Sequence, residues 1–386
     1  MPNNNSNVFE RHPKKTLAIL LFIFFLLLDF GGAAALKLLG LFEPSYINSQ
    51  TLEAAYRRAD PVFHHGLKEN AVQDQAEWGG YYYRVQTNSL GFKDRRVREI
   101  ALQSRAPRLV FIGDSFTEGV GIAYEQTFVG LIDAQLAAQN IEVLNAAATS
   151  YSPIIYLRKV EHLLDDVGLK FDHLVVFVDL SDIEDEALGY RFDAQRNVVS
   201  RNSIDNVGQT TVKETERPFS LKEFFTEYTL ISGRLRNLAS YLKQQKRSWR
   251  DSLNQRRGRW TLDEAIYAQY GATGLTLAQQ HMSELKHVLD RHQIDMTLAV
   301  YPWPDQIYAR DYPNRHTRAW QAWAQHHGVA FMDLFPAFLQ ADAEQTIQDL
   351  FIIGDVHWND KGHAVVAEEF LKTFQFKEHR AIKPEP

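Results

Sequence analysis

Hydrophobic and polar residues alternate in blocks along most of the chain, and the blocks have the lengths of buried strands and amphipathic helices. Short apolar runs occupy residues 108–114, 141–148, 171–182, 295–302 and 329–334. Apolar residues recur with helical spacing at 124–139, 153–168, 275–292, 314–327 and 360–374. Strands that alternate with helices in this way are typical of a parallel sheet covered by helices on both faces. The sequence therefore predicts an α/β fold, a three-layer α/β/α sandwich with a mainly parallel sheet.

A long apolar segment precedes these blocks and predicts a membrane-spanning helix. Residues 16–36 contain one acid, Asp29, and have the length of roughly 20 residues that a bilayer requires. An acid at the centre of a span costs about 2.5–3.5 kcal/mol, which the surrounding Leu, Ile and Phe residues offset. A cleaved signal peptide that ends at the alanines 33–35 is the alternative. Apolar residues continue to Leu41 and favour an uncleaved anchor.

The charges before this segment predict its orientation. Arg11, Lys14 and Lys15 precede the apolar residues, and positive residues flank the cytoplasmic end of a span. Residues 1–15 are therefore expected in the cytoplasm, and the chain from about residue 45 onward on the other side. The prediction is a single-pass inner-membrane protein with a periplasmic domain.

The pattern divides the exported part into three regions. Residues 44–107 mix aromatic, strand-like residues with turn residues, and form a membrane-proximal lead-in. The strand and helix pattern fills 108–375 but fails from about 186 to 255, which we interpret as an insertion in the domain. Residues 376–386 form a C-terminal tail.

Composition excludes several kinds of site. The 386 residues carry a formal net charge of −6 and include no cysteine, which excludes disulfides, thiolate metal sites and a cysteine nucleophile. The basic stretch 243–259 is interpreted as a solvated helix face, so no nucleic-acid partner is indicated. No feature of the sequence calls for a metal or a cofactor.

Two motifs carry candidate chemistry. Gly113-Asp114-Ser115 follows the first apolar run, at the carboxyl end of a strand, where open α/β sheets place their ligand sites. Far along the chain, Asp355 precedes His357 by two residues. From such positions a carboxylate can accept the Nδ1 proton of the imidazole, so that Nε2 faces a serine hydroxyl. The first motif alone is more typical of a plain turn with a helix N-cap, and the second motif reverses this interpretation in favour of Ser115 as a nucleophile.

The two motifs together resemble those of the SGNH, or GDSL-type, hydrolase superfamily, over roughly residues 80–375. The resemblance implies a flavodoxin-like fold and acyl transfer, with Ser115 as nucleophile, His357 as general base and Asp355 as its partner. In many members three positions separate the Asp from the His. Here Asp355 lies two before His357, as in some membrane-anchored relatives.

The blocks that form the oxyanion hole in that family are altered here. Where the family commonly has a Gly and an Asn, this chain has Ser150 and Ser181. Backbone N–H groups of Ser115 and Ser150 can still receive an oxyanion. Loss of a side-chain donor such as the Asn costs about 2.7–4 kcal/mol of transition-state stabilisation. Ser115, Ser150 and Ser181 are the candidate oxyanion residues.

These features predict a membrane-anchored serine esterase that needs no cofactor. The expected substrate is an O-acyl ester, and the resemblance and the predicted location suggest acylated cell-envelope carbohydrate. Two alternatives stay open. One is an O-acyltransferase, and the other is a catalytically weak SGNH fold that binds or assembles an envelope polysaccharide, which Ser150 and Ser181 favour.

The remaining polar groups are interpreted as structural. The acids of residues 179–186 are expected in a solvated loop rather than around a cation. His363 is expected to be a helix residue that packs near the site. The rings and prolines of residues 301–306 fit either rigid loop packing or contact with a sugar.

Overall fold

The computed structural model describes residues 12–41, 49–201, 228–232, 234–235, 242 and 246–374. Most of the predicted cytoplasmic N-terminus, the middle of the predicted insertion and the whole predicted tail lie outside these residues. The chain divides into two compact units. One contains the N-terminal helix and the described residues between 228 and 246, and the other contains the described residues from 52 to 201 and from 247 to 374.

The larger unit is built on a five-stranded sheet with the order β11-β10-β7-β5-β6, in which all neighbours are parallel. Its strands are β5 (Arg108–Ile112), β6 (Glu142–Asn145), β7 (His173–Val178), β10 (Asp295–Val300) and β11 (Ala330–Asp333). Each strand lies inside an apolar run of the sequence, and all residues of β5 and β7 are buried. The order is that of a flavodoxin-like sheet, whose ligand crevice opens at the carboxyl ends of β5 and β7.

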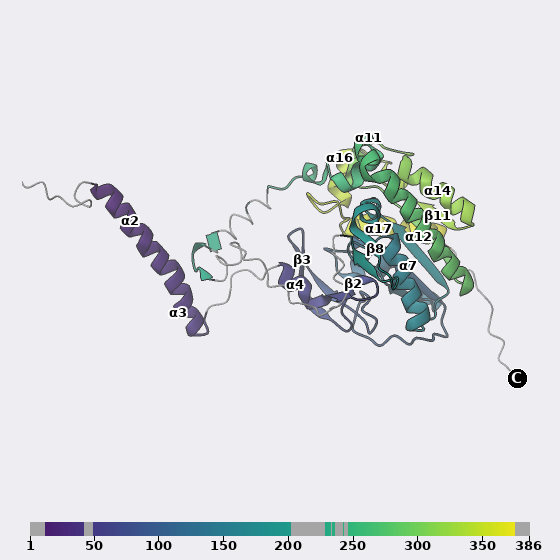
Figure 1. Ribbon diagram of the computed structural model, residues 1–386, viewed down its shortest axis with the longest axis horizontal. Coiled ribbons are helices and arrows are strands. Elements are labelled where there is room, and N and C mark those ends of the chain that lie inside the picture. The colour runs from purple at the N-terminus through teal and green to yellow at the C-terminus, as the bar shows by residue number, and fades with distance from the viewer. Residues whose placement is uncertain are drawn as a thin grey trace, which may run out of the picture. The chain divides into compact units, whose positions relative to one another are not determined.

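Helices cover both faces of this sheet (Figure 1). The long ones are α6 (Phe128–Leu136), α7 (Pro153–Glu161), α12 (Ala272–Arg291), α14 (Arg315–His327) and α17 (Asp360–Thr373). Helix α6 contacts α17, whereas α12 contacts both α7 and α14. Figure 1 shows α7 and α12 side by side over one face of the sheet. The predicted three-layer α/β/α fold with a mainly parallel sheet is confirmed.

Shorter elements surround this framework. The helices are α4 (Ser49–Tyr56), α5 (Ser115–Glu118), α8 (Asp182–Glu184), α11 (Glu264–Ile266), α13 (Pro304–Ala309), α15 (Phe335–Phe338) and α16 (Ala343–Leu350). The strands form three antiparallel pairs: β1 (Arg57–Asp60) with β2 (His64–Leu67), β3 (Val72–Trp78) with β4 (Tyr81–Gln86), and β8 (Tyr190–Phe192) with β9 (Val198–Ser200). The first two pairs lie in the region predicted as a lead-in, and the third lies in the predicted insertion.

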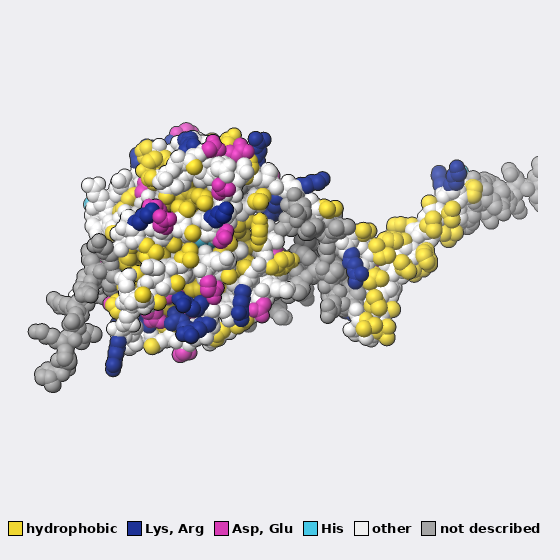
Figure 2. Space-filling model, turned by 180° about the vertical axis from the view of Figure 1, so that it is seen from behind, with side chains coloured by type: hydrophobic (Ala, Val, Ile, Leu, Met, Phe, Trp, Pro, Cys, Tyr) yellow, Lys and Arg dark blue, Asp and Glu magenta, His cyan; other side chains and the backbone are white. Residues whose placement is uncertain are grey.

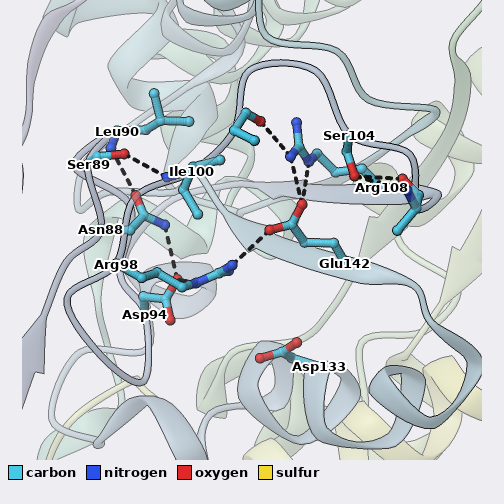
Figure 3. Close-up of polar contacts among 12 residues, drawn as sticks. Asn88, Ser89, Leu90, Asp94, Arg98, Ile100, Ser104, Arg108, Asp133 and Glu142 are labelled. Carbon is cyan, nitrogen blue, oxygen red and sulfur yellow. Dashed lines mark hydrogen bonds and ion pairs between the residues drawn. The ribbon is translucent and has the colours of Figure 1, made fainter.

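A network of charged side chains ties the residues before β5 to the sheet (Figure 3). Arg108 is 1% exposed and donates from Nε and Nη2 to Glu142 Oε2, at 2.8 and 2.7 Å. Glu142 Oε1 accepts from Arg98 Nη1 at 2.8 Å, and Arg98 Nε donates to Asp94 Oδ2 at 2.7 Å. Burial opposes ionisation of Glu142, but its bonds to the two guanidinium groups lower its pKa. The residues that lead into the domain are thus part of its compact unit.

The smaller unit contains a helix long and apolar enough to cross a membrane, Pro13–Leu38. At 1.5 Å per residue its 26 residues extend about 39 Å. It consists of α2 (Pro13–Leu26), a π-helical turn (Leu27–Gly31) and α3 (Gly32–Leu38), and hydrophobic side chains line its length in Figure 2. An N-terminal signal sequence meets the same criteria.

Asp29, the acid within this helix, has polar partners that its position in the sequence did not reveal. Its carboxylate accepts from Ile231 N and Ser232 Oγ, each at 2.5 Å, and its backbone oxygen accepts from Leu230 N at 3.0 Å. All three partners come from the predicted insertion. Acids within apolar spans commonly acquire such partners, since an unpaired carboxylate in hydrocarbon is costly.

Candidate active site

Ser115 lies directly beyond the carboxyl end of β5, as the first residue of α5. Asp114 caps this short helix by accepting a hydrogen bond from Phe116 N at 2.9 Å. Gly113 leaves no room for a side chain, because a Cβ atom there would lie 2.2 Å from Thr117 Oγ1. The Gly-Asp-Ser sequence therefore forms a turn too tight for other residues at its first position, and holds Ser115 at the sheet edge with 7% of its surface exposed.

His357 and Asp355 lie in the loop between α16 and α17 and form a hydrogen-bonded line with Ser115. His357 Nε2 is 2.7 Å from Ser115 Oγ, and His357 Nδ1 is 2.5 Å from Asp355 Oδ1. The same carboxylate oxygen accepts from the backbone N–H of His357 at 3.0 Å. The two-residue spacing thus lets one oxygen hold both the backbone and the ring of the histidine.

Aromatic rings enclose the imidazole of His357. The Phe116 ring centroid is 4.6 Å away, and Trp78 of β3 presents an edge-on contact at 5.1 Å. Sequence reasoning missed Trp78, for which the only signal was the aromatic character of residues 78–83. These rings leave His357 8% exposed.

The environment shifts the pKa values of both loop residues. Burial favours the neutral imidazole of His357, but the Asp355 carboxylate and its hydrogen bond outweigh burial and raise the His357 pKa above its ordinary value. Burial likewise opposes ionisation of Asp355, yet its contacts with His357 lower the Asp355 pKa. The pair therefore favours an imidazolium beside a carboxylate, which is the charge distribution that follows proton transfer from a serine.

The candidate oxyanion residues differ in what their groups contact. Ser150 has a left-handed backbone conformation with φ +62°, and its carbonyl oxygen accepts from Tyr190 OH at 3.0 Å. Ser181 directs both of its donors at one atom, Asp179 Oδ1, with its N–H at 2.7 Å and its hydroxyl at 2.6 Å. The Ser181 hydroxyl is therefore engaged within the protein, because an acid stands two residues before it.

The expectation of a solvated acidic loop after β7 is wrong for its main members. Asp179 and Asp182 are both 0% exposed, and Glu186 is 1% exposed. Donors from other elements reach the first two: Trp303 Nε1 lies 2.7 Å from Asp179 Oδ2, and Tyr156 OH lies 2.8 Å from Asp182 Oδ2. These acids follow a central strand, so they lie in the interior, although their local sequence looks like a surface loop.

Asp179 and Asp182 form a cluster with Asp114. One carboxylate oxygen from each lies within 4.8 Å of the other two, the one group of three candidate metal-ligating residues found in the described part of the chain. Protein donors from Ser181 and Trp303 already engage both oxygens of Asp179. The cluster is therefore an acidic, buried wall beside Ser115, in which hydrogen-bond donors of the protein occupy the Asp179 carboxylate.

Residues 301–306 contribute to the site by rigid packing, one of the two roles expected for them. Tyr301 is fully buried and donates to Asp114 Oδ1 at 3.2 Å. His363 lies on α17, as expected, where its Nδ1 accepts from Phe128 N at 3.2 Å. Burial lowers the His363 pKa to about 3, so this histidine is neutral and structural.

A comparison of the sequence with known families identifies one match. The sequence profile of the GDSL-like lipase/acylhydrolase family matches residues 111–365, which include both motifs. No curated protein matches the chain.

Several solved structures are similar to this chain at low identity. An acetylxylan esterase from Geobacillus stearothermophilus is 15% identical, with a TM-score of 0.38 and coverage of 73% of this chain and 100% of that one. A member of the lipolytic G-D-S-L family from Veillonella parvula is 14% identical, with a TM-score of 0.37 and coverage of 70% and 98%. A psychrotrophic esterase from Pseudoalteromonas sp. is 11% identical, with a TM-score of 0.36 and coverage of 69% and 95%.

The family profile covers about two thirds of the chain, from the strand that precedes Ser115 to the helix that follows His357. The chain belongs to the GDSL-like lipase/acylhydrolase family and is an esterase of the SGNH type.

Proposed function

We propose that Ser115, His357 and Asp355 form a catalytic triad that cleaves O-acyl esters. One observation carries the proposal, the unbroken line of contacts from Ser115 Oγ to His357 Nε2 at 2.7 Å and from His357 Nδ1 to Asp355 Oδ1 at 2.5 Å. A nucleophile, a base and a group that orients the base in this order are the signature of activated-serine chemistry.

The geometry suits an acyl-enzyme mechanism. As Ser115 Oγ bonds to the acyl carbon, its proton passes to His357 Nε2, and Asp355 stabilises the imidazolium. The tetrahedral intermediate collapses when His357 returns that proton to the departing alcohol, which leaves an acyl ester on Ser115. Water then attacks this ester while His357 takes a proton from the water. As the second tetrahedral intermediate collapses, His357 returns that proton to Ser115 Oγ, which releases the acid and restores the serine hydroxyl.

We assign the oxyanion hole to backbone donors. The N–H groups of Ser115 and Ser150 are the proposed donors, which agrees with the sequence expectation for these two residues. Ser181 was expected to contribute its hydroxyl, but both of its donors are directed at Asp179. Its proposed role is therefore indirect, through the position and charge of Asp179.

The proposed substrate is an O-acylated carbohydrate of the cell envelope. Positive residues before the apolar helix favour a single-pass inner-membrane protein with its catalytic domain on the periplasmic side, where such polymers lie. Exposed rings adjoin Trp78, which contacts His357: Tyr81 is 45% exposed and Tyr82 67% exposed, both on β4. Rings with an apolar face and a polar tip suit the faces and hydroxyl groups of sugars.

A second candidate function follows from the engaged Ser181 hydroxyl. A hole with one donor fewer stabilises the oxyanion less, whether water or a sugar hydroxyl attacks the acyl-enzyme, which favours a role in polysaccharide binding or assembly with little turnover. An O-acyltransferase differs from the esterase only in the acceptor of the acyl group.

Full-length protein in detergent micelles would distinguish these functions. We expect release of p-nitrophenol and acetate from p-nitrophenyl acetate, and release of acetate from an O-acetylated polysaccharide. If addition of the deacetylated polysaccharide diverts acetyl groups onto the glycan, detected by proton NMR, the protein is a transferase. Absence of product in every arm, with the fold intact by circular dichroism, would contradict the enzymatic proposal and leave the binding role.

A further inference from the structure

Three buried carboxyl groups line the wall beside Ser115. Asp114 is 2% exposed, and Asp179 and Asp182 are 0% exposed. Among the residues that the structure describes, none of the three forms an ion pair with Lys or Arg. Three negative charges this close in a buried site oppose one another, and burial disfavours each of them. Some of these groups must therefore hold a proton.

The hydrogen-bond donors show which acid is ionised. Asp179 receives three: Ser181 N and Ser181 Oγ at its Oδ1, and Trp303 Nε1 at its Oδ2. Hydrogen bonds donated to a carboxylate favour its charged form, and these three donors engage both oxygens of Asp179. Asp179 therefore carries the negative charge.

Asp182 has the opposite environment. Its Oδ2 accepts from Asp179 N at 3.0 Å and from Tyr156 OH at 2.8 Å, while its Oδ1 is buried without a hydrogen-bond partner in the described structure. Burial and the charges of Asp114 and Asp179 raise the Asp182 pKa well above its ordinary value. Asp182 is therefore neutral.

Asp114 contacts the proposed nucleophile itself. Its Oδ1 accepts from Phe116 N at 2.9 Å and from Tyr301 OH at 3.2 Å, and its Oδ2 lies 3.1 Å from Ser115 Oγ. The serine hydroxyl has one proton, and His357 Nε2 is its closer acceptor at 2.7 Å. An ionised Asp114 would compete for that proton. A protonated Asp114 would instead donate from Oδ2 to Ser115 Oγ and satisfy every group in the contact.

We propose that Asp114 acts as a carboxylic acid that donates a hydrogen bond to Ser115 Oγ and so directs the serine proton to His357, and that the Asp179 charge is the positioning element that keeps Asp114 protonated. This inference rests on the proposed function of Ser115. The Asp114 proton stays on Oδ2 throughout, and the only proton that moves is the one from Ser115 to His357. Asp179 thereby has an indirect role in the activity, through the protonation of Asp114.

The electrostatics of the cluster support this assignment. Burial first, and then the Asp179 charge, raise the pKa of Asp114 to about 8, against the opposing effect of His357. Tyr156 and Tyr301 face the cluster as neutral phenols whose pKa values burial raises. Arg257 acts on Asp114 and Asp179 through its charge, while its guanidinium pairs with Asp185.

The activity should depend on pH in a definite direction. Because burial and the Asp179 charge raise the pKa of Asp114 to about 8, we expect Asp114 to hold its proton at neutral pH and to lose it at alkaline pH. Ionisation draws the serine proton away from His357 and places a negative charge beside the developing oxyanion, so kcat/KM falls at alkaline pH. At the acid end, kcat/KM rises as His357 loses its proton, at a pH above that of an ordinary imidazole because its pKa is raised.

The test is the pH profile of kcat/KM for p-nitrophenyl acetate between pH 5 and 10, with Ser115→Ala as the background at each pH. For the wild type we expect kcat/KM to fall about tenfold per pH unit along the alkaline limb of the profile. Asp114→Asn keeps a donor beside Ser115 Oγ but cannot ionise, so its profile should change less than about twofold from pH 8 to pH 10. Asp179→Asn removes the charge that keeps Asp114 protonated, so its alkaline limb should move to lower pH.

Asp182→Asn is the matched control, because it replaces a buried acid of the same cluster that is already neutral, and its alkaline limb should stay at the wild-type position. A wild type without an alkaline limb, an Asp114→Asn variant that keeps it, or an Asp179→Asn variant whose limb moves upward would overturn the inference. A shift of the wild-type limb on addition of EDTA or Mg²⁺ would also overturn it, since a cation would then replace the proton. If Ser115→Ala retains activity, the proposed function fails; if it is inactive and the limbs do not respond, only the role of Asp114 fails.

Discussion

Ser115→Ala is expected to lower kcat/KM for p-nitrophenyl acetate by at least about 10³-fold, because it removes the atom that forms the covalent intermediate. The substitution deletes one oxygen, whose contacts are His357 Nε2 and Asp114 Oδ2. The turn itself depends on Gly113 and on the Asp114 cap, which the substitution leaves in place. The unfolding free energy should therefore change by less than about 1.5 kcal/mol, the size of one ordinary hydrogen bond.

Ser283→Ala is the matched control for this loss. Ser283 Oγ also lies against a histidine ring, 3.1 Å from His327 Nε2, but it belongs to α12. Its removal deletes a Ser–His contact of the same kind away from the proposed triad, and kcat/KM should stay within about twofold of wild type. Equal losses in the two variants would show that a general effect on folding, rather than nucleophilic catalysis, explains the result.

Arg57→Met is expected to destabilise the protein by about 3–5 kcal/mol, because it leaves the buried Glu118 charge without its ion-pair partner and with only the Thr149 donors. Arg57 donates from Nη1 and Nη2 to the two oxygens of Glu118, at 2.9 and 2.8 Å. The Glu118 side chain is 0% exposed, and that of Arg57 is 18% exposed. Burial opposes ionisation of Glu118, but Arg57 outweighs burial and lowers the Glu118 pKa.

This effect should depend on pH in a known direction. In the wild type the pair contributes stability that is present above the ordinary Glu pKa and is lost as pH falls through the lowered Glu118 pKa. The difference between Arg57→Met and wild type, measured by urea unfolding, should therefore shrink toward acid pH. Arg84→Met is the control, since Arg84 pairs with Asp74 on the surface, with both side chains more than half exposed, and should cost at most about 1 kcal/mol. Equal costs for the two variants would contradict this role for Arg57.

The strands and helices that follow residue 108 were predictable because their patterns are local. An apolar run such as 108–114 needs no partner to be recognised as a buried strand, and β5 lies within it. The Asp-x-His spacing was also informative, since it places a carboxylate beside the His357 ring through a single loop. These local features were sufficient for the sequence to indicate the sheet and the Ser115, His357 and Asp355 candidates.

What the sequence did not indicate depends on contacts between distant segments. Asp179 and Asp182 stand in an acidic stretch that resembles a surface loop, yet they are buried because β7 lies between β5 and β10. Trp78 reaches His357 from a hairpin far before the sheet. Asp29 was recognised as an isolated acid, whereas its partner Ser232 lies 203 residues later. Charge and burial at such positions follow from the tertiary arrangement rather than from local composition.

The most direct test of the proposed triad is covalent labelling of the full-length protein with an alkyl fluorophosphonate, followed by peptide mass spectrometry. A serine activated by a neighbouring histidine attacks the phosphorus and displaces fluoride, so we expect one adduct per chain, located on Ser115. His357→Ala should retain Ser115 and its turn but lose the adduct, because the imidazole that accepts the Oγ proton is removed and the neighbouring Asp114 is proposed to be protonated. An adduct on another serine, or equal labelling of Ser115 in wild type and His357→Ala, would contradict the assignment of Ser115 as a nucleophile activated by His357.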